Sequence, residues 1–293
     1  MSRVSLIIEG GGMRGLFSAG VLDFFIQRNL YFNNVYGVSA GACHGLSYIS
    51  KQFDRARRVN INYVKNPGYS GIAAFLREAT FFGFDYIFNK IPRREPIDWY
   101  NFFNNQNPER KFYITVTDSQ TGTPGYFSPS TPEEAIQWLR ASSSLPIIGK
   151  PVKYKGRIWF DGGISDSIPL EKAESQGHTK HVIILTREKG YVKPPLSKTE
   201  KRLLKLLYSK YPALISASEN RHIKYNGTLE KIARLEAEGR AFVYRPSGEI
   251  PVGRLTKNVK KLESLYREGY EQACSKEKNL KNFLEQNNGA LQN

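Results

Sequence analysis

A serine stands in a setting that is typical of a catalytic nucleophile. Residues 37–41, GVSAG, match G-x-S-x-G between a short predicted strand and a predicted helix, which is the context of a nucleophile elbow. Gly37 and Gly41 leave room for a sharp turn that larger side chains would obstruct. The helix N-terminus and the N–H of Ala40 would favour negative charge on a carbonyl oxygen attacked by Ser39. The alternative is a glycine-rich turn with an unreactive serine, because so short a pattern also occurs by chance.

A second glycine-rich run follows the first predicted strand. Gly10, Gly12 and Gly15 satisfy G-x-G-x-x-G, the fingerprint of dinucleotide-binding folds. Such a fold needs an acidic residue after the next strand to hold the ribose, but residues 38–39 are Val and Ser. A P-loop is excluded as well, because no Gly-Lys-Ser/Thr closes the run. The run therefore predicts an anion-binding loop of another kind.

This loop is predicted to form an oxyanion hole. Successive backbone N–H groups at Gly11 and Gly12, reinforced by Arg14, form a nest that attracts an anion. In a parallel sheet the loop and the Ser39 elbow would lie side by side, since both follow the carboxyl ends of strands. We expect Gly11, Gly12, Arg14 and Ala40 to stabilise the oxyanion.

Three motifs in this order resemble the patatin-like phospholipase family. A further segment before the last motif is also similar, and the resemblance spans roughly residues 4 to 186. The motifs and the segment occupy residues 10–15, 37–41, 161–163, 141–146 and 151–152. The resemblance implies a three-layer α/β/α fold with a mostly parallel central sheet, a serine lipid acyl hydrolase activity and no cofactor or metal.

By this resemblance, Asp161 is the second member of a Ser-Asp pair. A predicted strand delivers Asp161 to the loop formed by Gly162 and Gly163. A carboxylate can accept the proton of Ser39 if its site is dry enough to raise its proton affinity. Asp166 is the rival acid, although helix capping explains it adequately.

A Ser-His-Asp triad is a competing arrangement for this motif. His44 follows Ser39 on the same predicted helix and is expected to point away from it, while His178 and His181 flank a predicted strand. His222, on a predicted helix over 213–235, is the remaining candidate base. The Ser-Asp pair is favoured, and a Ser-His-Asp esterase stays the alternative.

Strands and helices are predicted to alternate along the first part of the chain. We expect a catalytic domain over 1–190 and a mainly helical extension over 191–293 that packs on it. Ten aromatic residues between 75 and 103 suit a second core layer, or an acyl-chain groove under a mobile cap, and the core is favoured. The predicted strands are 4–8, one that ends at 35–36, 111–118, 126–128, 157–160, 182–185 and 240–245, and the predicted helices are 16–26, 42–48, 53–64, 131–143, 198–211, 213–235 and 255–274.

Composition indicates a globular protein, and its positive charge indicates either anionic partners or a solvated face that keeps the protein soluble. The 293 residues carry a formal net charge of +16 and 40% hydrophobic side chains. The two cysteines predict neither a disulfide framework nor a metal site, and no signal or membrane-spanning stretch is recognised. We expect a cytoplasmic protein, possible peripheral contact with the inner face of an anionic membrane, and no specific nucleic acid.

The basic residues are concentrated after the family-like region. Residues 187–210 hold eight basic and two acidic side chains. Leu203, Leu204 and Leu207 share one face of the predicted helix 198–211. This helix could lie on a membrane, but packing of its leucines on the parent domain is favoured. A non-catalytic basic module that binds membrane or nucleic acid is thus the alternative to an enzyme. The terminus at 287–290 is expected to fray.

Overall fold

A computed structural model describes residues 4–104 and 110–285; the predicted fraying at 287–290 lies outside them. One mostly parallel sheet runs in the order β5-β6-β3-β2-β1-β7-β8, and β4 pairs with β3. The pairs β1/β2, β1/β7, β2/β3 and β7/β8 are parallel, whereas β3/β4, β3/β6 and β5/β6 are antiparallel. The strands are β1 Val4–Ile8, β2 Asn34–Val38, β3 Lys111–Asp118, β4 Pro124–Phe127, β5 Val152–Tyr154, β6 Arg157–Asp161, β7 Lys180–Ile184 and β8 Ala241–Tyr244.

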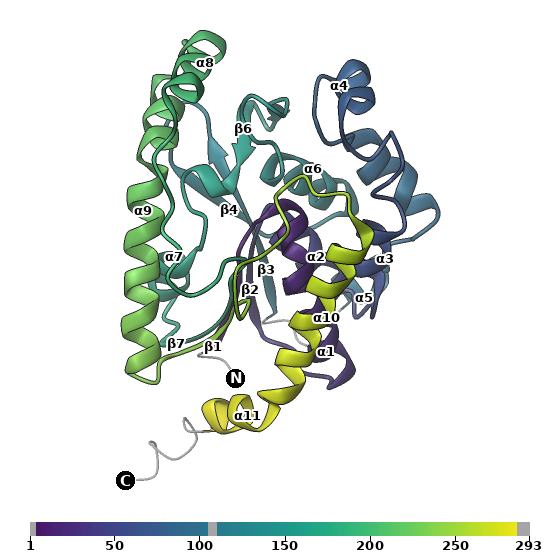
Figure 1. Cartoon of the computed structure of the whole chain (residues 1–293), viewed down its shortest axis with the longest axis vertical. Coiled ribbons are helices and arrows are strands. Elements are labelled where there is room, and N and C mark those ends of the chain that lie inside the picture. The colour runs from purple at the N-terminus through teal and green to yellow at the C-terminus, as the bar shows by residue number, and fades with distance from the viewer. Residues whose placement is uncertain (1–3, 105–109, 286–293) are drawn as a thin grey trace.

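Helices cover both faces of the sheet (Figure 1). The helices are α1 Leu16–Gln27, α2 Ala40–Ile49, α3 Arg55–Ile61, α4 Ile72–Glu78, α5 Trp99–Phe103, α6 Pro132–Ser142, α7 Leu170–Ser175, α8 Lys198–Tyr208, α9 Pro212–Ala237, α10 Val259–Ser275 and α11 Glu277–Glu285. Short helical turns are η1 Gly12–Gly15, η2 Tyr86–Lys90, η3 Ile91–Arg93 and η4 Gly162–Ile164.

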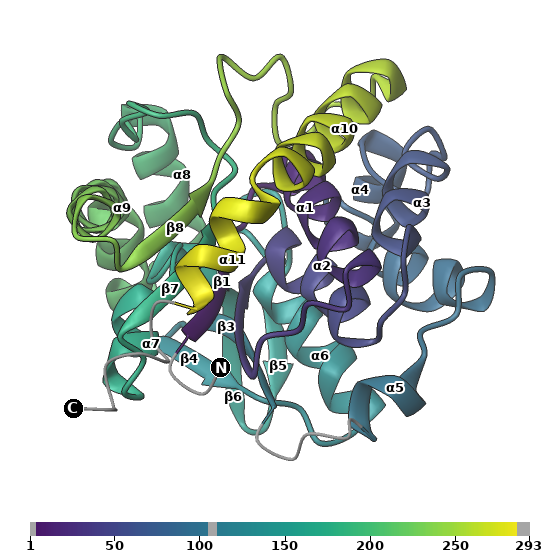
Figure 2. The same cartoon turned by 90° about the horizontal axis from the view of Figure 1, so that it is seen from below.

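Alternation of side chains along β1 separates the core into two layers. Leu6 and Ile8 belong to the larger cluster, with α1, α2 and α10, whereas Ile7 belongs to the smaller cluster, with α7 and α9. Because the strand is covered on both faces, all five of its residues are buried, and all of them except Ser5 are apolar. Figure 2 shows α9 on one side of the sheet and α1, α2 and α10 on the other. The predicted three-layer α/β/α fold is confirmed.

The region after residue 190 is built into the same sheet and core. Strand β8 extends the sheet edge by pairing with β7, and α10 crosses α1 at two glycines. A Cβ on Gly20 would lie 2.0 Å from the carbonyl oxygen of Tyr266, and one on Gly269 would lie 2.1 Å from that of Phe17. Close approach of the two helices therefore requires glycine at both positions.

Helix α8 corrects the expectation that its leucines pack on the parent domain. Its first turn is closed by a capping box between Ser197 and Glu200, as a helix start of this kind favours. Leu204 is buried, but Leu203 and Leu207 are exposed, and Leu206 is 76% exposed. The packing expectation therefore holds for Leu204 and is wrong for Leu203 and Leu207, because only one row of this short helix faces the protein. An apolar strip is left open to solvent.

Residues 4–104 and 110–285 contain neither a membrane-spanning helix nor a cluster of metal ligands. None of the helices in these ranges has the length and apolar character needed to cross a bilayer. In the same ranges, no three His, Cys, Asp or Glu side chains are grouped to hold a metal ion.

Candidate active site

Ser39 occupies a strained turn between β2 and α2. Its backbone has φ 53° and ψ −125°, a conformation that is costly for a residue with a side chain and is found mainly at functional sites. A Cβ on Gly41 would lie 2.4 Å from the carbonyl oxygen of Ile8, so the elbow closes tightly against β1. The N–H of Ser39 donates to Ser142 Oγ at 2.8 Å. The turn is thus held from both sides.

The glycine-rich loop lies directly against this elbow. A Cβ on Gly10 would come within 2.9 Å of Ser39 Cβ. Gly12 adopts φ 56°, in the left-handed region, and a Cβ there would lie 2.6 Å from the carbonyl oxygen of Arg254. That same oxygen accepts a 3.1 Å hydrogen bond from the N–H of Met13. A loop of the C-terminal region therefore holds the glycine loop in place.

The glycines and the alanine predicted to form the oxyanion hole line one pocket. Gly11, Gly12 and Ala40 line it together with Ser39. Ala40 is the first residue of α2, so its N–H has no carbonyl partner within the helix. The N-terminus of α2 therefore places positive potential beside the serine.

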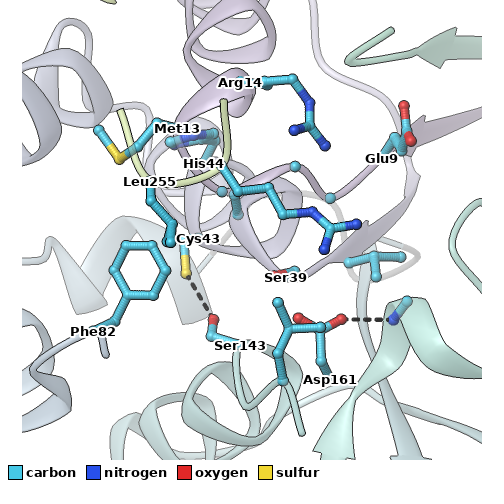
Figure 3. Close-up of a pocket in the computed structure, with 18 of the residues that line it drawn as sticks. Glu9, Met13, Arg14, Ser39, Cys43, His44, Phe82, Ser143, Asp161 and Leu255 are labelled. Atoms are coloured by element: carbon cyan, nitrogen blue, oxygen red, sulfur yellow. Dashed lines mark hydrogen bonds between the residues drawn. The ribbon is translucent and has the colours of Figure 1, made fainter. Parts of the chain in front are cut away.

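Arg14 brings a full positive charge to the same place. Its side chain is buried, and its Nε has no hydrogen-bond partner among the described residues. Burial, together with Arg187 and Arg254, lowers the pKa of Arg14 to about 10, against the opposing effect of Glu9. The guanidinium therefore stays charged at neutral pH. Figure 3 shows Ser39 between Arg14 on one side and Asp161 on the other.

Asp161 ends β6 and lines the same pocket. It is 1% exposed; Oδ1 accepts a 2.7 Å hydrogen bond from the N–H of Gly163, whereas Oδ2 has no partner among the described residues. Burial raises the pKa of Asp161, and the charge of Arg221, the Ser39 hydroxyl and the Gly163 N–H oppose that rise. A dry carboxylate with one free oxygen next to a serine hydroxyl is equipped to accept a proton.

The rival acid and the histidines occupy other environments. Asp166 accepts a 2.5 Å hydrogen bond from the Tyr126 hydroxyl and does not line the pocket. His222 does not line it either, and its Nδ1 lies 3.0 Å from the carbonyl oxygen of Glu219. His44, expected to point away from Ser39, lines the same pocket, but no hydrogen bond joins it to Ser39 in the described parts of the chain. Burial lowers the pKa of His44 to about 4.

The remaining motif glycines stand behind the pocket and keep its walls close. A Cβ on Gly162 would lie 2.2 Å from the carbonyl oxygen of Thr115, and one on Gly37 would lie 2.6 Å from Ala42 Cα. A Cβ on Gly15 would lie 2.8 Å from the ring of His44. The predicted residues that line the pocket itself are Gly10, Gly11, Gly12, Arg14, Ser39, Ala40, Asp161 and Gly163.

The pocket has an apolar part and a cationic part. Aromatic residues between 82 and 88 supply apolar wall, so this region forms both core and groove. The apolar lining comprises Phe82, Phe84, Ile87, Phe88, Leu145 and Ile148. The cationic part holds Lys193, Arg221 and Arg254, which sequence reasoning did not assign to the site. The density of basic residues around Lys193 could have indicated a functional role for this residue, whereas Arg221 and Arg254 belong to no motif.

Comparisons with known proteins match the region that carries these motifs. A family model described as patatin-like phospholipase matches residues 6–174, and a domain of unknown function matches 211–285. The uncharacterized protein YjjU of Escherichia coli is 32% identical over 186 residues, 63% of this chain and 52% of that protein. The chain therefore spans about half the length of this relative.

More distant relatives carry names from lipid hydrolysis. Lysophospholipase NTE1 of Candida albicans is 23% identical over 61% of this chain and 13% of that protein. The probable lipid hydrolase 463L of Invertebrate iridescent virus 6 is 25% identical over 58% of this chain and 62% of that protein. VipD from Legionella pneumophila superposes with a TM-score of 0.45 and 12% identity, over 94% of this chain and 66% of that one. With a family model that covers more than half of its residues, the chain belongs to the patatin-like phospholipase family.

Proposed function

We propose that the protein is a serine lipid acyl hydrolase, a carboxylic ester hydrolase that uses a Ser39-Asp161 dyad. The observation that carries the proposal is the strained backbone of Ser39 at φ 53°, in a pocket shared with the buried Asp161. The apolar lining suits an acyl chain, and the names of the relatives support a lipid substrate.

In the proposed reaction, Ser39 Oγ attacks the ester carbonyl carbon while its proton passes to Asp161 Oδ2. The carbonyl electron pair moves to the oxygen, where the N–H groups of Gly11, Gly12 and Ala40 and the charge of Arg14 stabilise it. Collapse of the tetrahedral intermediate breaks the ester bond, and the leaving alcohol takes the proton from Asp161. Water then attacks the acyl-enzyme by the same sequence, which releases the fatty acid and restores Ser39.

The dyad is favoured over a Ser-His-Asp triad by the surroundings of the two side chains. No histidine within 4–104 or 110–285 hydrogen-bonds to Ser39 or Asp161. The closest candidate, His44, has a pKa lowered to about 4 by burial, so it would accept a proton poorly at neutral pH. Asp161 has the opposite property, because its burial raises its proton affinity.

A labelling experiment tests the nucleophile. The unmodified protein should react with a fluorophosphonate probe and hydrolyse p-nitrophenyl butyrate, whereas Ser39→Ala should do neither. Ser209→Ala, at an exposed serine after α8, is the control and should behave like the unmodified protein. Hydrolysis at the parent rate by Ser39→Ala would refute the assignment. Absence of both reactions in the unmodified protein would favour the non-catalytic basic module.

We infer further that the enzyme acts as a peripheral protein at an anionic lipid surface, such as the inner face of the cell membrane. Helices α4 and α8 lie at the same end of the molecule in Figure 1. Both expose apolar side chains there: Leu76 is 78% exposed and Leu206 is 76% exposed. Helix α8 flanks its leucines with lysines and an arginine, which suits the interface of an anionic bilayer. No specific nucleic-acid partner is proposed.

A further inference from the structure

Four basic side chains converge on the pocket that holds Ser39. Arg14 comes from η1, Lys193 from the segment between β7 and α8, Arg221 from α9 and Arg254 from the segment between β8 and α10. The last three lie beyond residue 174, where the match to the family model ends. The C-terminal region therefore supplies most of this cationic cluster, which is defined as Arg14, Lys193, Arg221 and Arg254.

No member of the cationic cluster forms an ion pair within the described ranges. Arg221 donates only to Ser167 Oγ, through Nε and Nη2 at 3.4 Å each. Lys193 Nζ lies 4.1 Å from the centre of the Tyr225 ring. Arg14 is 6% exposed, and its Nε has no partner in this part of the chain. A buried basic group such as Arg14 is usually paired, and Lys193, Arg221 and Arg254 are partly buried beside it, so the cluster is incomplete without an anion.

The carboxylates of the pocket do not neutralise the cluster. Glu9 is already engaged, because Oε2 accepts from the Thr186 N–H at 2.6 Å and Oε1 from the Tyr225 hydroxyl at 2.8 Å. Asp161 already accepts a hydrogen bond from the Gly163 N–H and acts as the base in the proposed reaction. Glu9 and Asp161 are the acidic residues that line the pocket, against four basic ones. With every basic side chain protonated and both carboxylates ionised, the pocket has a formal excess of two positive charges.

Electrostatics within the pocket shows how strongly these cations oppose one another. Burial, followed by the charges of Arg221, Arg254 and Arg14, lowers the pKa of Lys193 to about 7, although Glu9 raises it. Burial and Arg254 likewise lower the pKa of Arg221 to about 10. A bound anion would favour the charged form of each group and relieve their repulsion.

We propose that Lys193, Arg221 and Arg254, together with Arg14, bind the phosphate group of an anionic lysophospholipid whose acyl ester lies at Ser39. This inference rests on the proposed function for the position of the ester. A phosphate monoester carries nearly two negative charges, which matches the excess in the pocket. Its three terminal oxygens can accept from several guanidinium and ammonium donors at once. The apolar lining receives the acyl chain.

The same surroundings disfavour a zwitterionic choline headgroup. A quaternary ammonium group is recognised by the open face of aromatic rings. Two rings beside the cluster each have a cation over one face: Arg187 lies 4.2 Å from the centre of the Tyr191 ring, and Lys193 lies 4.1 Å from that of Tyr225. A choline cation would also meet the repulsion of the cluster itself. The structure thus favours a phosphomonoester over a phosphocholine.

Binding to the inactive variant Ser39→Ala tests the inference without relying on turnover. Calorimetric titration would compare lysophosphatidic acid, lysophosphatidylcholine and monoacylglycerol with the same acyl chain, below micelle formation. We expect lysophosphatidic acid to bind about tenfold more tightly than either of the others, or better, because lysophosphatidylcholine offers fewer charged phosphate oxygens for charge-assisted hydrogen bonds and monoacylglycerol offers none. Equal affinity for the three lipids overturns the inference.

Variants locate the effect at the cluster. In the Ser39→Ala background, Arg254→Gln removes the side-chain charge and keeps the backbone oxygen that holds Met13. It and Lys193→Gln should each abolish the preference for lysophosphatidic acid. Arg267→Gln, at an exposed arginine of α10 outside the pocket, should retain it. Melting curves show whether each variant is folded. The comparison of the three lipids uses Ser39→Ala alone, so it tests the inference even if a variant of the cluster does not fold. If folded Arg254→Gln and Lys193→Gln still prefer lysophosphatidic acid to the same extent, the assignment of the phosphate site to the cationic cluster is overturned.

Two further comparisons separate the possible explanations. Inorganic phosphate should compete with lysophosphatidic acid only weakly, since it lacks the acyl chain; affinity equal to that of the lipid would show a site for free phosphate and refute the headgroup assignment. If the unmodified protein hydrolyses no ester while Ser39→Ala keeps the preference, the proposed function fails and the anion site stands. If all three lipids are hydrolysed and bound alike, the proposed function stands and the anion site fails.

Discussion

Asp161 accepts a 2.7 Å hydrogen bond from the N–H of Gly163 through Oδ1, and this contact leaves Oδ2 as its free oxygen. Gly163 follows directly in η4, so the loop itself orients the carboxylate. A buried oxygen without a donor is costly. A proton from Ser39 would satisfy it, which makes the arrangement suited to a general base.

The substitution Asp161→Asn should separate the chemistry from the structure. The amide oxygen of the variant side chain would still accept from Gly163, but its NH₂ group cannot take a proton, so we expect kcat to fall by about two to four orders of magnitude. His222→Ala is the matched control and should retain most of the activity, because its ring lies outside the pocket. Steady-state rates with p-nitrophenyl butyrate measure both. The reverse pattern would establish a triad.

The pH dependence of kcat/KM should report the ionisation of Asp161. Only the ionised carboxylate can accept the serine proton, so kcat/KM falls as pH falls through its pKa. Since burial raises that pKa above the ordinary value of 3.8, the inflection should lie above 3.8. Arg221→Gln should move the inflection higher, because Arg221 favours the ionised form, whereas Arg267→Gln should leave it in place. A profile that is flat down to about pH 4 would remove Asp161 as the base.

Membrane contact should depend on the charge of α8. Replacing Lys198, Lys201, Arg202 and Lys205 by Gln removes attraction of about 1 kcal/mol for each charge near an anionic surface. Co-sedimentation with phosphatidylglycerol vesicles should drop, and hydrolysis of vesicle lipid should drop with it. The unmodified protein should bind phosphatidylglycerol vesicles more strongly than phosphatidylcholine vesicles. This binding should weaken at high salt, because the Debye length shrinks to about 3 Å at 1 M.

A charge-matched variant controls for the loss of net charge. Arg28, Arg267, Lys278 and Lys281 are exposed on or beside α1, α10 and α11, and α11 lies at the opposite end of the molecule from α8 in Figure 1. Their replacement by Gln should affect vesicle binding much less. Equal losses in the two variants would mean that total charge, rather than α8, drives binding. Vesicle binding that does not change with salt or with lipid charge would mean that the basic residues serve another partner.

Stability should depend on the glycine crossing of α1 and α10. Gly269→Ala places a methyl group 2.1 Å from the carbonyl oxygen of Phe17, and such overpacking should lower the free energy of unfolding by about 1–3 kcal/mol. Gly227→Ala on α9 is the control, because a Cβ there meets nothing within 4 Å; it should raise stability by up to about 1 kcal/mol through helix propensity. Urea unfolding measures both, and equal effects of the two substitutions would contradict the role of the crossing.

The structure brings together residues that are far apart in the sequence, and some of these contacts were predictable from the sequence. Ser39 and the loop at Gly10 follow adjacent strands, β2 and β1, whose parallel pairing places their carboxyl ends at one edge. Asp161 ends β6, which pairs with β3 in the opposite direction. The sequence indicates that Asp161 follows the carboxyl end of a strand, but its pairing with Ser39 is implied by the family resemblance, since no local pattern shows how an antiparallel strand is placed.

Local sequence was less informative about the C-terminal region. The amphipathic spacing of α8 indicated a helix, but the depth to which its leucines are buried depends on what lies beneath them, and Leu206 is left exposed. Ten aromatics between 75 and 103 could form core or groove, and residues such as Phe84 and Phe88 do both. Periodicity reports which side chains share a face and says nothing of what covers that face.

The sequence by itself determined the elements that carry the chemistry: the alternating strands and helices, the glycine turns and the serine at a strand-to-helix junction. These follow from hydrophobic periodicity and from turn geometry, which act over a few residues. Only the tertiary structure decided that Lys193, Arg221 and Arg254 join Arg14 beside Ser39. Their convergence depends on how β8, α9 and α10 pack against the sheet. Contacts between segments separated by tens to hundreds of residues leave no local signal in the chain.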